Sequence, residues 1–200
     1  MVGVLSQFIQ NPGPTHWEGV KRVITYLGSM RDLWLTFGGN EDVLLEGYSD
    51  LDWASHTHRH SISSYLFNYG WGMVSWSLKK RNIIALSSTE AEYIVQTHAA
   101  KEGIWLKSFI NKIGGGEEGP LTIMADNQSA IALVKDNKFY SRTKHISLQY
   151  HFICEAVEDE RVRMEYIPTS ENVADISTKA LAKPKSTKFV GRLGLVMMKD

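Results

Sequence analysis

The feature that most constrains the fold is the stretch at residues 83–100, IIALSSTEAEYIVQTHAA. Residues 87–90 (SSTE) match a capping box, which predicts that a helix starts there and gives Glu90 a structural role. Counted from Glu92 at helical spacing, one face of this helix is small and apolar, with Val95, Ala99, Leu106 and Ile110. Glu92 therefore opens a buried face, where a carboxylate is costly unless a positive charge compensates it. A metal ion is one candidate for that charge.

Three other acids are candidate partners of Glu92. Asp50 lies late in a predicted strand, Asp126 ends another, and Asp175 lies on the last predicted helical region. Ligands that are all oxygens suit Mg²⁺ or Mn²⁺, and two such ions can activate water against a phosphodiester. Each acid also has a simpler interpretation: Asp126 as a helix N-cap, Asp50 and Asp52 as turn formers, and Asp175 as a solvated residue.

The rest of the pattern predicts an α/β domain behind a helical appendage. Residues 1–42 form the appendage, with a second capping box at residues 15–18 and a helix after it. Three strands then precede a series of helices and strands, which predicts a mixed sheet with helices packed on it. The predicted strands are 43–52, 63–69, 73–78, 121–126 and 161–167, and the predicted helices are 87–113, 128–135, 146–157 and 171–181.

Charge and composition exclude several classes. Lys and Arg number 22 and Asp and Glu number 22, so no overall basic field predicts nucleic-acid binding and any such function depends on local patches. Basic runs occur at residues 79–81 and 138–151. The single cysteine, Cys154, excludes an internal disulfide and suits a reducing compartment. No apolar run reaches the roughly 20 residues of a membrane span, so we expect a soluble, intracellular protein with no membrane partner.

Seven short motifs together resemble the ribonuclease H domain of copia-type retrotransposon polyproteins. They are residues 47–54 (GYSDLDWA), 75–77 (SWS) with 79–80 (KK), 85–93 (ALSSTEAEY), 126–130 (DNQSA), 142–146 (RTKHI), 150–153 (YHFI) and 174–179 (ADISTK). The resemblance covers residues 43–200, and residues 1–42 resemble the end of the preceding reverse transcriptase. It implies the ribonuclease H-like fold, a five-stranded mixed sheet whose first three strands are antiparallel, flanked by helices.

The same resemblance implies a two-metal endoribonuclease that hydrolyses the RNA strand of RNA/DNA hybrids during reverse transcription. Its four catalytic and metal-binding acids fall on Asp50, Glu92, Asp126 and Asp175, with Asp52 as a rival for the first position. Two Mg²⁺ ions are expected, with Mn²⁺ as a substitute. The expected substrate-binding residues are Lys79, Lys80, Asn127, Gln128, Arg142, Lys144 and His145. The implied partners are the hybrid, the reverse transcriptase and the rest of the polyprotein. The implied location is the cytoplasm, in a virus-like particle, with the nucleus as the alternative.

Two other functions remain open at this stage. One is a hybrid-binding scaffold of little or no activity that supports the reverse transcriptase, and the other is DNA cleavage or strand transfer by a related fold. For His145, a hydrogen bond at a helix start is the simpler alternative to a role at the substrate.

Several further side chains have structural interpretations. Trp53, Trp71, Trp76 and Trp105 are expected in the core or on a sheet face, with stacking on nucleic acid as the alternative for Trp71, which lies beside glycines. Cys154 is expected in the core, and His56, His58 and His60 in solvent.

Overall fold

The computed structural model describes residues 1–38, 44–52, 61–81, 88–115, 118–135 and 147–197. The chain divides into two compact units, Met1–Trp34 with Leu195–Asp200, and Leu35–Gly194. The boundary predicted at residue 42 stays a prediction. Among the described residues, no helix has both the length and the apolar character that crossing a membrane requires.

The first unit is built mainly from helices. Its elements are α1 (Val2–Leu5), the 3₁₀ helix η1 (Ser6–Phe8) and α2 (Pro14–Ser29), and the short strands β1 (Leu33–Leu35) and β7 (Leu195–Met197) pair with each other. The helix predicted after residue 15 is confirmed, but its predicted capping box is wrong. α2 starts at Pro14, and the N–H of Gly13 donates to Nδ1 of His16 over 2.8 Å. Proline suits this position because the first helical N–H has no partner within the helix.

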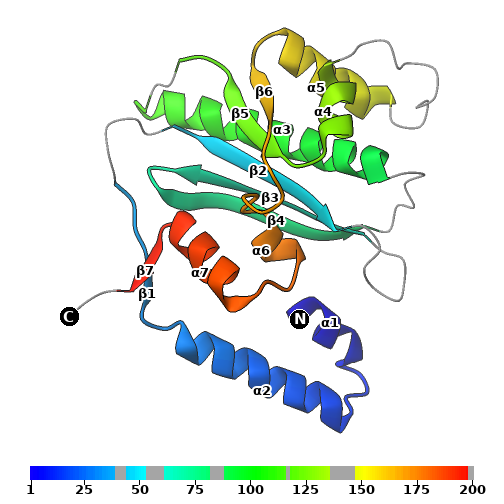
Figure 1. Cartoon of the computed structure of the whole chain (residues 1–200), viewed down its shortest axis with the longest axis vertical. Coiled ribbons are helices and arrows are strands. Elements are labelled where there is room, and N and C mark those ends of the chain that lie inside the picture. Colours follow the sequence, from blue (N-terminus) through cyan, green and yellow to red (C-terminus); the bar gives the residue numbers. More distant parts are fainter. Residues whose placement is uncertain (39–43, 53–60, 82–87, 116–117, 136–146, 198–200) are drawn as a thin grey trace. The chain divides into compact units, whose positions relative to one another are not determined.

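The second unit contains the mixed five-stranded sheet, in the order β4-β3-β2-β5-β6. Strands β2 (Glu46–Asp52), β3 (Ser61–Tyr69) and β4 (Gly72–Arg81) are antiparallel, and β5 (Leu121–Ala125) and β6 (Val162–Tyr166) run parallel to β2. Helices α3 (Ser88–Lys112), α4 (Gln128–Lys135) and α5 (Ser147–Glu158) cover one face of the sheet, and α6 (Asp175–Thr178) and α7 (Lys183–Arg192) cover the other (Figure 1). The expected α/β fold class is confirmed.

Alternation along β2 separates the two cores. Leu51 packs against Ala91 and Val95 of α3, whereas Tyr48 belongs to the cluster that includes Phe189 of α7. Because successive side chains of a strand point to opposite faces, Asp50 lies on the face of Tyr48, opposite the face that carries Leu51. The strand thus carries the buried carboxylate of Asp50 in the same row as the buried Tyr48, just before the strand ends at Asp52.

The last helical region differs from the prediction. The helix expected over residues 171–181 is limited to α6, because Lys179 leaves the helical conformation with φ −120° and ψ 150°. A new helix, α7, then begins at Lys183 with Pro184 in its first turn. Asp175 therefore lies on a four-residue helix that packs beside β2 and β3.

The exposed fractions of the side chains contradict a core position for three tryptophans and confirm it for the cysteine. Trp71, Trp76 and Trp105 are 66%, 63% and 59% exposed, so a core position is wrong for all three. Trp76 does lie on a sheet face, but on the edge strand β4, where no neighbouring strand follows. Cys154 is buried, as predicted. Trp53 lies outside the described residues.

Candidate functional site

Three carboxylates converge at one end of the sheet. Asp50 comes from β2, Glu92 from the N-terminal part of α3, and Asp126 directly follows β5. One oxygen of each lies within 4.8 Å of an oxygen of the other two. Parallel pairing of β2 with β5 explains this convergence for the two aspartates. Tyr48 and Met124 are register partners, and Asp50 and Asp126 each follow two residues later on the same face.

The electrostatics of this group favour a bound cation. Asp50 is 1% exposed and Glu92 is 7% exposed, and Oε2 of Glu92 is buried and has no hydrogen-bond partner among the residues that the structure describes. Burial raises the pKa of Glu92 to about 9, and the charges of Asp50 and Asp126 add to the effect. Burial also raises the pKa of Asp50. Two carboxyls whose pKa values are raised by burial, with a third carboxylate beside them, fit a divalent cation such as Mg²⁺ or Mn²⁺.

The fourth expected acid, Asp175, is held by two lysines. Its Oδ1 accepts from Nζ of Lys179 over 2.6 Å, and its Oδ2 accepts from Nζ of Lys185 over 2.7 Å. Lys179 also donates to Oδ1 of Asp50 over 3.2 Å. Burial alone would lower the pKa of Lys179, but its hydrogen bonds and charge interactions with Asp175 and Asp50 outweigh burial and raise it. Asp175 is thus joined to the three-carboxylate group through an ammonium group, and its role as a ligand stays a prediction.

Two side chains that the sequence analysis did not single out fix the position of Asp50. Asn172 is fully buried, and its Nδ2 donates over 2.9 Å to the carbonyl of Ser49, the residue before Asp50. The hydroxyl of Thr178 donates to Oδ2 of Asp50. A sequence signal for Thr178 and Lys179 existed, because both lie about one helical turn after Asp175.

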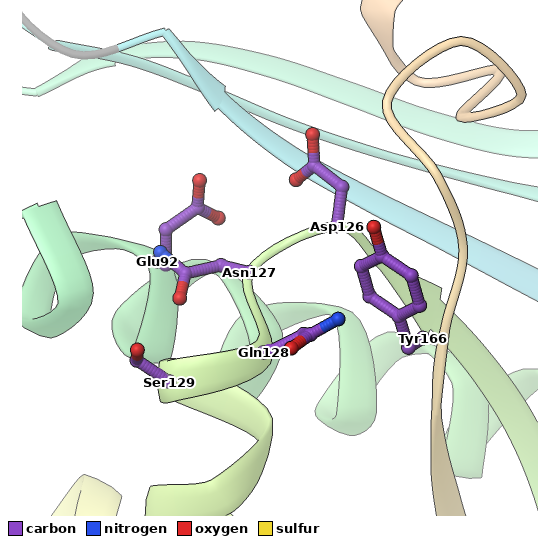
Figure 2. A pocket seen from close by; sticks show the side chains of 6 residues that line it. All are labelled: Glu92, Asp126, Asn127, Gln128, Ser129 and Tyr166. Carbon is purple, nitrogen blue, oxygen red and sulfur yellow. The ribbon is translucent and has the colours of Figure 1, made fainter.

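An open pocket of about 360 Å³ adjoins the carboxylates, lined by Glu92, Asp126, Asn127, Gln128, Ser129 and Tyr166. The carboxylates of Glu92 and Asp126 point to the same side of this pocket (Figure 2). The hydroxyl of Thr169 donates to Oδ2 of Asp126 over 2.8 Å. The N-cap interpretation of Asp126 is wrong: Oδ1 of Asn127 accepts from the N–H of Ala130 over 3.0 Å and caps α4. Asp126 is therefore available to a ligand in the pocket.

The two predicted substrate-binding lysines on β4 lie on opposite faces of the sheet. Lys80 pairs with Ile62, which pairs with Asp52, so Lys80 shares the face of Asp50 and Asp52. Lys79 has the opposite orientation, and both lysines are exposed. Asp52 lies on the same face as Asp50 but outside the three-carboxylate group.

Other predicted positions cannot be compared with the structure. The expected substrate-binding residues Arg142, Lys144 and His145 lie outside the described residues, as do His56, His58 and His60. Ser87, the first residue of the predicted capping box, does too. The basic segment around residue 142 therefore stays a prediction, and among the described residues the candidate site consists of the carboxylates, the pocket and Lys80.

No family model matches the chain. The chain is 44% identical over 185 residues to the retrovirus-related Pol polyprotein from transposon TNT 1-94 of Nicotiana tabacum, covering 92% of this chain and 14% of the polyprotein. It is 49% identical over 106 residues to secreted RxLR effector protein 161 of Plasmopara viticola, covering 52% of this chain and 75% of that protein. The solved structure of LC11-RNase H1 in complex with RNA/DNA hybrid overlaps with a TM-score of 0.49 at 13% identity, covering 66% of this chain and 92% of that one.

The second unit has the sheet arrangement that the sequence analysis expected. The sheet has the strand order and directions that the resemblance to ribonuclease H domains implied, with helices on both faces. The relatives that match almost the whole chain are Pol polyproteins, and the chain spans about a seventh of their length. The chain therefore belongs to the family of retrovirus-related Pol polyproteins from copia-type transposons, and its second unit has a ribonuclease H-like fold.

Proposed function

We propose that the second unit is a divalent-metal-dependent endoribonuclease that hydrolyses the RNA strand of RNA/DNA hybrids during reverse transcription. The observation that carries this proposal is the group of Asp50, Glu92 and Asp126 beside an open pocket, with one oxygen of Glu92 buried and without a hydrogen-bond partner in the described part of the chain. Such an oxygen is expensive to bury unless a cation takes the place of the missing partner. Membership of the Pol polyprotein family supplies the biological setting.

Asp50, Glu92 and Asp126 would hold the metal, and Asp175 is the further ligand that the resemblance implies. We expect two Mg²⁺ ions, with Mn²⁺ able to replace them, because carboxylate oxygens are the ligands that these ions prefer. When bound, such ions supply an activated water and stabilise the leaving 3′ oxygen of the phosphodiester. The expected products carry 5′-phosphate and 3′-hydroxyl ends.

The protein's own side chains would orient the ligands and receive the substrate. Thr178 and Lys179 hold the carboxylate of Asp50, and Thr169 holds that of Asp126, so each presents a preset direction. The polar groups of Gln128 and Tyr166 line the pocket and suit contacts with a sugar–phosphate backbone. A hybrid would be distinguished from duplex DNA by its shape and its 2′-hydroxyl groups.

Partners and location follow from the family and are proposals as well. With a formal net charge of zero, the chain has little long-range attraction for phosphates, so we expect the reverse transcriptase portion of the polyprotein to provide much of the grip on the hybrid. The expected site of action is a cytoplasmic virus-like particle, with the nucleus as the alternative. Lys80 would neutralise a phosphate beside the acidic group.

The test is cleavage of a hybrid whose two strands carry different labels, in Mg²⁺ and in Mn²⁺, alongside duplex DNA. We expect metal-dependent cutting of the RNA strand only, and a loss of more than about a hundredfold in Asp126→Asn, which exceeds the usual cost of removing an outer residue. Asp52→Asn is the matched control, because it makes the same change on the face of Asp50 but outside the group, and it should cut normally.

Equal cutting by Asp126→Asn and wild type would refute the proposed site, and equal cutting of duplex DNA would favour the strand-transfer alternative. If the wild type did not cleave the hybrid, the assay would be repeated with the reverse transcriptase attached. A protein that still bound the hybrid there but did not cleave it would support the hybrid-binding scaffold function instead.

A further inference from the structure

The ammonium group of Lys179 bridges two carboxylates that water barely reaches. Asp50 and Asp175 are each 1% exposed, and Nζ of Lys179 lies 3.2 Å from Oδ1 of Asp50 and 2.6 Å from Oδ1 of Asp175. The second oxygen of Asp175 accepts from Lys185. Both oxygens of Asp175 therefore already accept from lysine ammonium groups, so a metal ion approaching either oxygen would meet a positive charge 2.6 or 2.7 Å from it.

The backbone places Lys179 at this point. Its N–H donates to the carbonyl of Asp175 over 2.9 Å, which closes one helical turn, and its extended conformation then turns the chain away. Asn172 ties the start of the same segment to β2 through the carbonyl of Ser49. The side chain of Lys179 is 33% exposed, so its flexible stem has a route out to solvent.

We propose that Lys179 is an internal counter-cation of the acidic site, which holds Asp50 and Asp175 together without metal and competes with a divalent ion for this pair. The inference rests on the proposed function, since it assumes that the site binds such ions. Two buried carboxylates side by side need a positive charge, and the lysine supplies it until an ion replaces it. One ion then binds beside Glu92 with Lys179 in place, and a second binds only when Lys179 swings out.

Lys185 offers a matched control. It carries the same charge, its side chain is 30% exposed, and its Nζ lies 2.7 Å from Oδ2 of Asp175. Its other hydrogen bond goes to the carbonyl of Thr169 over 3.1 Å. If only the overall charge near Asp175 mattered, replacing either lysine would have the same effect. If the bridge to Asp50 matters, replacing Lys179 has the larger effect.

The experiment is a calorimetric titration of the whole chain with Mn²⁺, using wild type, Lys179→Met and Lys185→Met, each checked for folding by circular dichroism. In Lys179→Met, we expect the affinity of the weaker of two Mn²⁺ sites to rise about ten- to a hundredfold. The ion then no longer has to break the lysine's hydrogen bonds to charged carboxylates, and the free energy of such bonds corresponds to this range of affinity. Lys185→Met should change that site clearly less. Adding Asp175→Asn to Lys179→Met should abolish the gain.

A second readout uses no metal. In EDTA, Lys179→Met should unfold at a lower urea concentration than Lys185→Met, and Mn²⁺ should remove the difference. Equal effects of the two lysine variants, in affinity and in urea, would overturn the inference. The proposed function fails separately: if Asp126→Asn leaves all Mn²⁺ binding unchanged, the site does not hold metal at all, whatever the lysine variants do.

Discussion

Replacing Glu92 with glutamine should remove most of the pH dependence that this residue gives to the stability of the metal-free protein. The pKa of Glu92 rises from 4.5 in the unfolded chain to about 9 in the folded one, first because of burial and then because of Asp50 and Asp126. A folded state with a raised carboxyl pKa holds its proton more tightly than the unfolded state. The full stability is therefore present below pH 4.5 and is lost progressively as the pH rises toward 9.

The size of the effect follows from linkage. Each pH unit inside this window costs about 1.4 kcal/mol, so the free energy of unfolding should fall by about 2.5 kcal/mol between pH 5 and pH 7 because of Glu92 alone. Glutamine has nearly the same shape and never ionises, so Glu92→Gln should lack this contribution. Other groups titrate in both proteins, which is why the difference between the two is the quantity to measure.

The assay is urea unfolding in EDTA at pH 5, 6, 7 and 8. Glu90→Gln is the matched control, because Glu90 lies two residues before Glu92 on the same helix but is only half-buried. The stability of this variant should change with pH as that of the wild type does. Adding Mg²⁺ at pH 7 should stabilise wild type and leave Glu92→Gln almost unchanged, since a ligand stabilises only the state that binds it. A wild type and a Glu92→Gln variant with parallel pH profiles would refute the reasoning.

Three further predictions concern other parts of the second unit. Gln96→Met should raise the free energy of unfolding in urea by about 1 kcal/mol, because neither polar atom of the buried Gln96 amide has a hydrogen-bond partner among the described residues. A destabilised variant would show that a buried water satisfies these atoms. Asn172→Ala should lower it by about 1–3 kcal/mol by leaving the carbonyl of Ser49 without its donor, and a change below about 0.5 kcal/mol would contradict this. Lys80→Ala should weaken hybrid binding and reduce its salt dependence by about one phosphate contact, whereas Lys79→Ala on the opposite face should not; equal losses in a salt titration would contradict the assignment of faces.

Much of the local structure could be read from the sequence. The helix at residues 128–135 has the predicted bounds, and Glu92 does start the buried face that its spacing predicts, with Val95, Ala99, Leu106 and Ile110 all buried. These features depend on periodicity and end signals that lie within a few residues of one another. The fold class and the family came from the order of several short motifs, each of them weak alone.

The sequence by itself thus determined most of the elements and the fold class and named four candidate acids, three of which the structure brings together, but only the tertiary structure decided how the acids are held. The contacts of Asp50 with Thr178 and Lys179 join residues 128 and 129 positions apart, and no local pattern encodes them. They depend on the parallel pairing of β2 with β5 and on where the chain returns after β6. The sequence does not show whether a metal ion or a lysine neutralises the charge of Asp175. Only the packing of the folded chain brings Lys179 and Lys185 to its two oxygens.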